Sequence, residues 1–418
     1  MAVAVVPTLD GSSVTLPSDR TPGERAAKAK VTLVGSKVRC ISVTTPAELE
    51  ALEGRWRTLL SNAALQSPYF SWDFADEWLR HFVRGRVGGA TGDFEVVVVV
   101  DAAGNDVAIA PFYLERNLGI AAFGHILQPF GRSNSFEPMT DEPIAIFRSG
   151  TEVEATAAIR EHVLARWGSR CDVATMWVPS GGDKLEKKQV GGAPGALGVT
   201  RLGEGPLVVP LARSWPAFLA GLSKSMRDNV SYYPRKLSRE IGQWSMSVAR
   251  KPDEVAEAAR ALVALHHARS QATTGLKHID HIPTAHHAAF LHAWFQRAAM
   301  RDQIAIMTLK IRGEVVAAQV FLESPGCVSI YYSGFDARYH RYSPLTVITA
   351  EMVRMSIERG RGRIEFPPGS KLWKSRWNAR EDHKPFEMSF YATRPASLVR
   401  GVVRRVYFRL TAAAATGA

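Results

Sequence analysis

The sequence predicts an α/β (α+β) fold of two tandem domains, each with a mixed, mostly antiparallel central sheet flanked by helices. The length of 418 residues is more than one hydrophobic core usually serves and suits two domains. A hydrophobic content of 46% and a charged content of 22% are those of a globular protein. The third observation is an architectural repeat, because the order strand, helices, antiparallel meander, helix and strand occurs in both halves.

The first half begins after a stretch that lacks periodicity. Residues 1–38 are punctuated by Ser, Thr, Pro and Gly, so we expect a disordered tail there. Pro46 suits the first turn of the first helix, and Ser71 suits the N-cap of the second. The expected elements are a strand at 39–43, helices at 45–63 and 71–84, strands at 94–100 and 106–115, a helix at 151–168 and a strand at 171–178.

The second half repeats this order. A helical stretch at 214–242 contains Pro234, which we expect to kink the helix or split it in two, because proline lacks an N–H and clashes with the preceding turn. The final helix has Ser343 at the N-cap, Pro344 at N1 and Gly360 at C′. The elements are completed by a strand at 244–250, helices at 253–270 and 284–301, a three-strand meander at 304–311, 314–323 and 327–334, the helix at 343–360 and a strand at 363–366.

These patterns divide the chain into a tail at 1–38, a first domain at 39–205, a second domain at 206–393 and a basic amphipathic tail at 394–418. In the last part apolar residues interleave with arginines. Such a segment is typical of a frayed docking helix, of a contact with an anionic membrane face, or of an anionic-nucleotide site.

Composition limits the class of protein. No apolar run approaches the ~20 residues of a membrane-spanning helix, and the first residues lack the basic region of a secretory signal. Three cysteines without CxxC spacing indicate a reduced, cytoplasmic protein with no disulfide framework or structural zinc. The formal charge of +12 favours anionic partners such as nucleic acid, a phosphorylated cofactor or an anionic membrane. Arginine enrichment from a GC-rich genome gives the same charge.

Three stretches of the second half carry chemistry-bearing residues in a fixed order. They are "LSKSMRDNVSYYPRKLSRE" (222–240), "YYSGFDARYHRYSPLTVITAEMVRMSIERG" (331–360) and "IEFPPGSKLWKSRWNA" (364–379). Together they resemble the CelD-like or BioF-like acetyltransferases of the GNAT superfamily, which are related to the Fem-type aminoacyl transferases. The resemblance extends from Arg39 to Tyr391. Two positions depart from the family pattern, since Glu365 replaces an aspartate and Trp373 replaces another aromatic residue.

This resemblance implies two tandem GNAT-like domains and an acyl-CoA-dependent N-acyltransferase, with acetyl-CoA or another acyl-CoA as co-substrate and no metal. The implied acceptor is an amino sugar or a lipid-linked sugar of bacterial exopolysaccharide or cell-envelope biosynthesis. Direct attack in a ternary complex is expected, because the sequence offers no nucleophile elbow and no Cys–His pair. We expect no nucleic-acid partner and a cytoplasmic protein that contacts the inner membrane peripherally.

The helix start at Pro344 is the candidate cofactor site. Orphan amides at Leu345, Thr346 and Val347 and the helix dipole favour phosphate there. Family members bind the acyl-CoA phosphates at this helix start, usually with a glycine-rich loop. Here the preceding loop offers basic residues instead. The expected cofactor-binding residues are Ser343, Leu345, Thr346, Val347, Arg338 and Arg341. An ordinary well-capped helix would show the same pattern.

Glu365 and Lys374 are the candidate catalytic residues. Strand alternation separates Glu365 from its neighbours Ile364 and Phe366. Glu365 is then either a general base or substrate-orienting carboxylate in a cleft, or an edge carboxylate paired with Arg363 or Lys374. Lys374 and Arg376 suit either the charge that develops on the thioester oxygen or a phosphate on the acceptor, and a solvated basic face would show the same residues. The substrate-binding candidates, from the three stretches that resemble the family, are Arg227, Asn229, Tyr232, Tyr332, Arg376 and Trp377.

Three further features are expected to contribute less. Trp72, Asp73 and the loop at 128–138 are candidate contributions of the first domain, because ligands favour the crease between domains. Seven histidines crowd 266–292, but they lack a thiol or carboxylate ligand set, so we expect no metal. They are His266, His267, His278, His281, His286, His287 and His292. Arg400 and Arg404 form an RxxxR pair, which makes cyclic di-GMP a further candidate ligand, as in some relatives.

Two alternatives stay open at the level of function. A Fem-type transferase that uses aminoacyl-tRNA would also account for the basic charge, but the helical stretch 253–301 is short and broken for the helical arm of such enzymes. A catalytically idle GNAT pair could instead act as a binding or regulatory module at the membrane.

Overall fold

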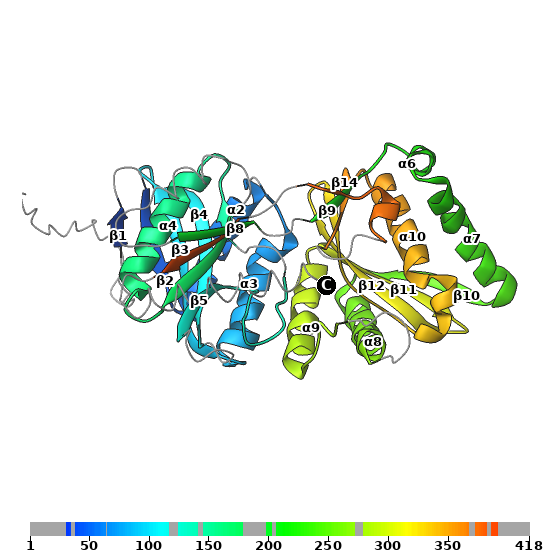
Figure 1. Ribbon diagram of the computed structural model, residues 1–418, viewed down its shortest axis with the longest axis horizontal. Helices are drawn as coiled ribbons and strands as arrows, with labels where there is room; N and C mark the ends of the chain where they lie inside the picture. Colours follow the sequence, from blue (N-terminus) through cyan, green and yellow to red (C-terminus); the bar gives the residue numbers. More distant parts are fainter. Residues whose placement is uncertain are drawn as a thin grey trace, which may run out of the picture.

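The computed structural model shows two units side by side, each with a central sheet and flanking helices (Figure 1). It describes residues 31–34, 38–63, 65–116, 124–140, 145–178, 198–202, 206–271, 279–367, 373–382 and 386–391. Within these ranges, no helix has both the length and the apolar character needed to cross a membrane. The two-domain α/β architecture predicted from the sequence is confirmed.

The first sheet has the strand order β1-β2-β3-β4-β5-β7-β16-β8, with β6 beside β4. Its strands are β1 (Val31–Val34), β2 (Val38–Val43), β3 (Ala90–Asp101), β4 (Asp106–Arg116), β5 (His125–Pro129), β6 (Ile146–Phe147), β7 (Val173–Val178), β8 (Gly198–Leu202) and β16 (Phe386–Tyr391). Its helices are α1 (Pro46–Ala51), α2 (Glu53–Ser61), a 3-10 turn (Pro68–Phe70), α3 (Trp72–Trp78), a π-helical turn (Leu79–Val83) and α4 (Glu152–Trp167). The capping box of Thr45 and Glu48 begins α1, as its sequence favours.

The second sheet has the order β10-β11-β12-β13-β14-β9-β15. Its strands are β9 (Leu207–Pro210), β10 (Trp244–Ala249), β11 (Ile304–Ile311), β12 (Glu314–Ser324), β13 (Cys327–Phe335), β14 (Arg363–Phe366) and β15 (Arg380–Glu381). Its helices are α6 (Trp215–Gly221), α7 (Lys224–Glu240), α8 (Pro252–Ser270), α9 (Ala285–Ala299), α10 (Pro344–Glu358) and 3-10 turns at Ala337–Tyr342 and Ser375–Trp377. The predicted meander and its Arg312–Gly313 turn are confirmed, and both turn residues have positive φ.

The same crossover occurs in both units. Strands β13 and β14 are parallel neighbours joined through α10, and β5 and β7 are parallel neighbours joined through α4. The β13–β14 ladder covers only Cys327–Ser329 against Arg363–Glu365, although β13 continues to Phe335. The two strands therefore part beyond Ser329 and Glu365, next to the start of α10. The family resemblance predicts that the cofactor binds at this end of the helix.

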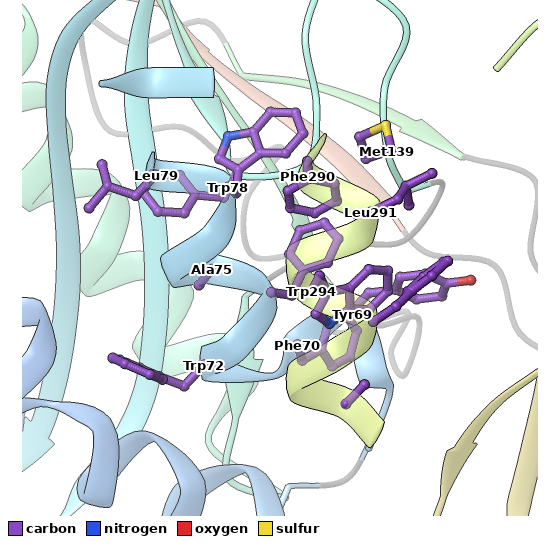
Figure 2. Packing of buried hydrophobic residues seen from close by; sticks show 14 of the residues in the cluster. Tyr69, Phe70, Trp72, Ala75, Trp78, Leu79, Met139, Phe290, Leu291 and Trp294 are labelled. Carbon is purple, nitrogen blue, oxygen red and sulfur yellow. The ribbon is translucent and has the colours of Figure 1, made fainter. Parts of the chain in front are cut away.

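One hydrophobic cluster contains residues of both units. Helix α3 of the first unit lies against α9 of the second, and Phe74 meets Trp294 edge to face at 4.9 Å. Figure 2 shows Trp78 from the first unit beside Phe290 from α9. At the rim of this core, Arg297 of α9 donates to Asp73 (3.0 Å), Asp76 (2.6 Å) and Glu77 (2.9 Å) on α3. Apolar packing and charge pairing together fix one unit against the other.

Three expectations about the fold need correction. The helical stretch after residue 214 divides at Leu222–Ser223, where the Ser223 hydroxyl caps α7, and α7 continues through Pro234 to Glu240. Strand β1 lies inside the predicted tail and pairs with β2, although the rest of 1–38 apart from Val38 lies outside the described residues. Strand β16, which the predicted boundary at 393 assigns to the second domain, pairs with β7 in the first sheet.

Candidate active site

A cavity of about 880 Å³ lies where the two units meet. Its walls come from the parted ends of β13 and β14, the start of α10, the end of α8 with the residues after it, and a loop of the first unit. Among the predicted site residues, those that line it are Tyr332, Ser343, Leu345, Thr346, Glu365, Lys374 and Trp377. This volume is in the ordinary range for a small-molecule or cofactor site.

The start of α10 has an unusual backbone. Ser343 occupies the predicted N-cap position with φ 44°, a left-handed conformation that a residue with a Cβ adopts at a cost. Its hydroxyl makes no capping hydrogen bond, and its carbonyl accepts the amides of Thr346 (2.9 Å) and Val347 (3.3 Å). Two of the three amides expected to meet phosphate thus already have an acceptor. The first turn carries no acidic residue, so the dipole at this end of the cavity is not neutralised.

A β-bulge shapes the second wall. Gln319 pairs with Ser333 and Phe321 pairs with Ile330, so Tyr331 and Tyr332 together oppose a single residue of β12. Both tyrosines line the cavity, and their rings stack with centroids 3.9 Å apart. A bulge redirects side chains and interrupts the ladder of backbone hydrogen bonds. It therefore brings two aromatic faces of one strand into the site.

Glu365 lies at the last position of β14 that pairs with β13. Its Oε2 accepts the Ser329 hydroxyl at 2.9 Å, and its Oε1 pairs with Arg363 at 2.9 Å. The side chain is buried and lines the cavity, while Ile364 and Phe366 belong to the hydrophobic core of the unit. The structure thus combines the two expectations, a carboxylate in a cleft and a carboxylate paired with Arg363.

Lys374 is a buried cation in the lining of the cavity, with 3% of its surface exposed. Its ammonium donates to the carbonyl of Pro367, directly after β14. Trp377, in the 3-10 turn that follows, is also buried and lines the cavity. A buried ammonium beside a cleft is suited to stabilising negative charge that develops there. The role of Lys374 stays a prediction.

The histidine-rich region supplies residues that the sequence reasoning did not assign to the site. His266 and His281 line the cavity, together with Glu137 from the first unit. The Nδ1 atom of His281 lies 2.6 Å from Oε1 of Glu137. No group of three or more His, Cys, Asp or Glu side chains suited to a metal occurs in the part of the chain that the structure describes. The signal that could have found this pair was the loop at 128–138 taken together with the histidine cluster.

Several predicted site residues lie away from the cavity. Helix α7 packs on α10 and the 3-10 turn before it, with Tyr232 exposed on its surface. Arg338 pairs with Asp336, and Arg341 lies beside Glu240 at 3.5 Å. The predicted residues outside the cavity lining are Arg227, Asn229, Tyr232, Arg338, Arg341, Val347 and Arg376. The amphipathic pattern of α7 does not distinguish a helix on the surface from a helix that lines a cleft.

The two candidates from α3 serve the contact between the units instead. Trp72 is buried, and the guanidinium of Arg297 on α9 lies over its ring at 4.7 Å. Asp73 pairs with Arg297 and Arg57. The candidate nucleotide-binding pair Arg400 and Arg404, the tail 394–418 and His278 lie outside the described residues.

The cysteines are poor nucleophiles. All three thiols are buried. Burial, followed by the charge of the nearby Glu365, raises the pKa of Cys327 to about 12. Burial likewise raises the pKa of Cys40 to about 12. Because the thiolate is the reactive form, neither side chain supports a covalent acyl-enzyme at neutral pH.

Comparison with known proteins agrees with this geometry. Residues 224–375 match the family described as an acetyltransferase (GNAT) domain. No curated protein matches the chain. The solved structure of FemX is 8% identical, with 80% of this chain and 95% of that chain covered and a TM-score of 0.55. This likeness shows the fold.

Two further solved structures are similar at lower scores. L-PGS from Bacillus licheniformis is 13% identical, with 86% of this chain and 96% of that chain covered and a TM-score of 0.47. A tandem GNAT protein from the clavulanic acid biosynthesis pathway is 10% identical, with 85% and 99% covered and a TM-score of 0.44. The second unit therefore carries the match to an acetyltransferase (GNAT) domain, and the repeated sheet-and-helix architecture gives the whole chain the fold of FemX.

Proposed function

We propose that the protein transfers an acyl group, most simply acetyl, from acyl-CoA to the amine of an amino sugar or lipid-linked sugar. The observation that carries this proposal is the opening between β13 and β14 at the acid-free start of α10, inside a cavity that both units line. A helix N-terminus favours a pyrophosphate, and parted strands offer backbone groups to an extended pantetheine arm. Ser343, Leu345 and Thr346 would hold the phosphate end.

The lining of the cavity supports a sugar as the acceptor. Aromatic rings come from both units, with Tyr69 and Trp177 from the first and Tyr331, Tyr332 and Trp373 from the second. Sugar rings present apolar C–H faces that pack on aromatic rings, while hydroxyl groups need polar partners at the edges. Thr349 and Gln319 supply polar atoms in the same lining. The Thr349 hydroxyl donates to the Gln319 side-chain oxygen at 3.0 Å.

The corresponding helix of the first unit, α4, begins with acidic residues, which indicates that the chain has one thioester site. Helix α4 carries Glu152 and Glu154 in its first turn, and the Glu152 carboxylate accepts the amide of Gly150 at 3.1 Å. Two carboxylates at a helix start repel phosphate and occupy the dipole. The corresponding place in the first sheet is beside the β5–β7 pairing. There the Thr175 hydroxyl donates to the Gln128 side-chain oxygen at 2.6 Å, so these two polar groups are paired with each other. We infer that the first unit acts as a wall of the site in the second.

The test is thiol release from acetyl-CoA by the full chain, with a panel of free, nucleotide-linked and lipid-linked amino sugars. We expect thiol release that depends on the acceptor, and an acetylated amine by mass spectrometry. Glu365→Gln and Lys374→Ala should lower turnover while acetyl-CoA still binds. Stabilisation by an aminoacyl-tRNA analogue alone would favour the Fem-type reaction. Binding of acetyl-CoA without turnover across the panel would favour a non-catalytic module.

A further inference from the structure

We propose that His281 and Glu137 form the base that removes the proton from the acceptor nitrogen, with one residue supplied by each unit. This inference rests on the proposed function and names the proton acceptor within the same cavity. Glu137 belongs to a loop of the first unit between β5 and β6, and His281 follows α8 in the second unit. Both line the cavity, and their side chains are 29% and 37% exposed.

The contact between the two side chains determines which ring nitrogen is basic. A carboxylate oxygen only accepts hydrogen bonds, so the His281 Nδ1 at 2.6 Å from Glu137 Oε1 carries the hydrogen. The lone pair of the neutral ring is then on Nε2. A carboxylate behind the imidazole also stabilises the imidazolium that forms when Nε2 takes a proton. This is the arrangement of a general base held by an orienting group.

Two buried histidines fix the backbones on either side of this pair. His266 Nδ1 donates to the carbonyl of Ser333 at 3.0 Å, and its Nε2 accepts the amide of His281 at 3.1 Å. His287 Nε2 donates to the carbonyl of Glu137 at 3.0 Å, and its Nδ1 accepts the Thr284 hydroxyl at 2.7 Å. Each ring is thus neutral with a defined tautomer.

Burial and packing support these assignments. Burial lowers the pKa of both His266 and His287, which favours the neutral rings. Tyr331 ties down the same loop of the first unit, because its hydroxyl donates to the carbonyl of Met139 at 2.5 Å. The His281 ring lies nearly parallel to Tyr332, at 12°, with centroids 6.1 Å apart. The crowded histidines are therefore a scaffold that presents one histidine to the cavity.

The surrounding charges are consistent with this role. On α8, Arg269 lines the cavity with a pKa that burial lowers, and His266 is neutral. Beside His281 in the chain, Asp280 is turned toward His267 at 2.8 Å. Elsewhere in the lining, Glu365 is already paired with Arg363, and Lys374 donates to the carbonyl of Pro367 directly after β14. Glu365 is thus better suited to orienting a substrate than to accepting its proton.

In the proposed step the acyl group moves from the thioester sulfur to the acceptor nitrogen, and atoms and charge are conserved. The neutral amine of the acceptor attacks the thioester carbonyl carbon, so an N–C bond forms and the C–S bond breaks. The nitrogen loses one proton to His281 Nε2, which becomes an imidazolium beside the Glu137 carboxylate. The thiol leaves as a thiolate and takes one proton from water, and His281 returns its proton to the resulting hydroxide. The products are an amide and free thiol.

The experiment compares His281→Gln, Glu137→Gln and the matched control His286→Gln in the full chain. His286 is exposed in the first turn of α9 and outside the cavity lining. The assay measures thiol release from acetyl-CoA with the amino sugar that gives turnover in the panel, between pH 5.5 and 9. We expect His281→Gln to lower kcat by roughly 10²–10⁴-fold and to remove the rising limb of the pH profile. KM for acetyl-CoA should stay within about twofold.

Glu137→Gln keeps an acceptor for Nδ1–H but removes the charge, so it should shift the rising limb to lower pH and lower kcat less than His281→Gln does. His286→Gln should leave the profile unchanged. Thermal unfolding of each variant checks that the fold persists. If His281→Gln retains the wild-type rate and profile, the pair is not the base and the proposed function stands. If the wild type releases no thiol from acetyl-CoA with any acceptor, the proposed function and the proton transfer are both overturned.

Discussion

Gly334 marks a close approach of β13 to α8 beside the candidate site. A Cβ at this position would lie 2.5 Å from the amide nitrogen of His266 and 2.8 Å from the carbonyl carbon of Leu265. Both neighbours are atoms of the helix backbone, so they move only if α8 moves. Packing therefore requires the glycine in "YYSG". A larger residue there would displace the backbone of His266, whose ring accepts the amide of His281.

Gly334→Ala should destabilise the protein by about 1–3 kcal/mol, because overpacking a closed contact forces a backbone shift. Chemical denaturation measures the free energy of unfolding. Gly54→Ala in α2 is the matched control, since a Cβ there meets nothing within 4 Å. The control should leave stability unchanged or raise it by up to about 1 kcal/mol. Equal stability of the wild type and Gly334→Ala would contradict the packing argument.

At the scale of elements, the sequence predicted most of the second unit closely. The strands at 304–311 and 363–366 match β11 and β14, and α10 lies where its punctuation indicated, with Gly360 in a left-handed conformation after it. Local signals suffice here because proline, glycine and capping residues act within a few positions along the chain. They failed on a split at Pro234, because the Ser223 hydroxyl caps a helix that continues through the proline.

The candidate site was less predictable because it is made of contacts between distant segments. Glu365 and the start of α10 lie in the cavity as their motifs suggested, whereas the basic residues of α7 lie outside its lining. The His281–Glu137 contact joins residues 144 positions apart. No local pattern encodes such a contact. The sequence provided its components, a loop and a histidine cluster, without the geometry that joins them.

The first turn of α10 allows a test of the proposed phosphate end. Thr346→Glu should raise KM for acetyl-CoA by roughly tenfold, because a carboxylate there repels phosphate and competes for the dipole. Thr346→Gln introduces the neutral isostere of glutamate and should raise KM for acetyl-CoA far less. An acidic residue in a first turn favours the helix itself, so lost affinity would not reflect unfolding. Equal KM values for the two variants would mean that the phosphates bind elsewhere.

At the scale of the whole molecule, the junction between the units depends on a charge cluster as well as on aromatic packing. Replacing Arg297 by Met leaves Asp73, Asp76 and Glu77 without their shared partner across the junction. We expect a loss of about 1–3 kcal/mol in the free energy of unfolding, because each buried carboxylate loses one charged partner, while Asp73 keeps Arg57 and Arg301 and Asp76 keeps Arg80. Arg235→Met on the exposed face of α7 is the control and should change stability by at most about 0.5 kcal/mol. A small effect at Arg297 would show that this arginine adds little to the aromatic packing and to the Arg301–Asp73 pair at the junction.

The same junction should weaken in acid. Burial opposes ionisation of Glu77, but hydrogen bonds from His81 and Arg297 and the charge of Arg297 lower its pKa overall from 4.5. A carboxyl whose pKa is lower in the folded state contributes stability above its unfolded pKa and loses it as pH falls through the folded value. The free energy of unfolding should therefore fall below about pH 4.5, and Glu77→Gln should make that fall shallower. An unchanged slope in the variant would exclude Glu77 as a contributor.

We infer a single thioester site, in the second unit, with the first unit as its wall. Calorimetric titration of the full chain with acetyl-CoA tests it most directly. We expect one mole of acetyl-CoA bound per mole of chain, with affinity reduced by Thr346→Glu and unchanged by Glu152→Gln at the start of α4. Two equivalents bound, or binding that Thr346→Glu leaves intact and Glu152→Gln alters, would contradict it.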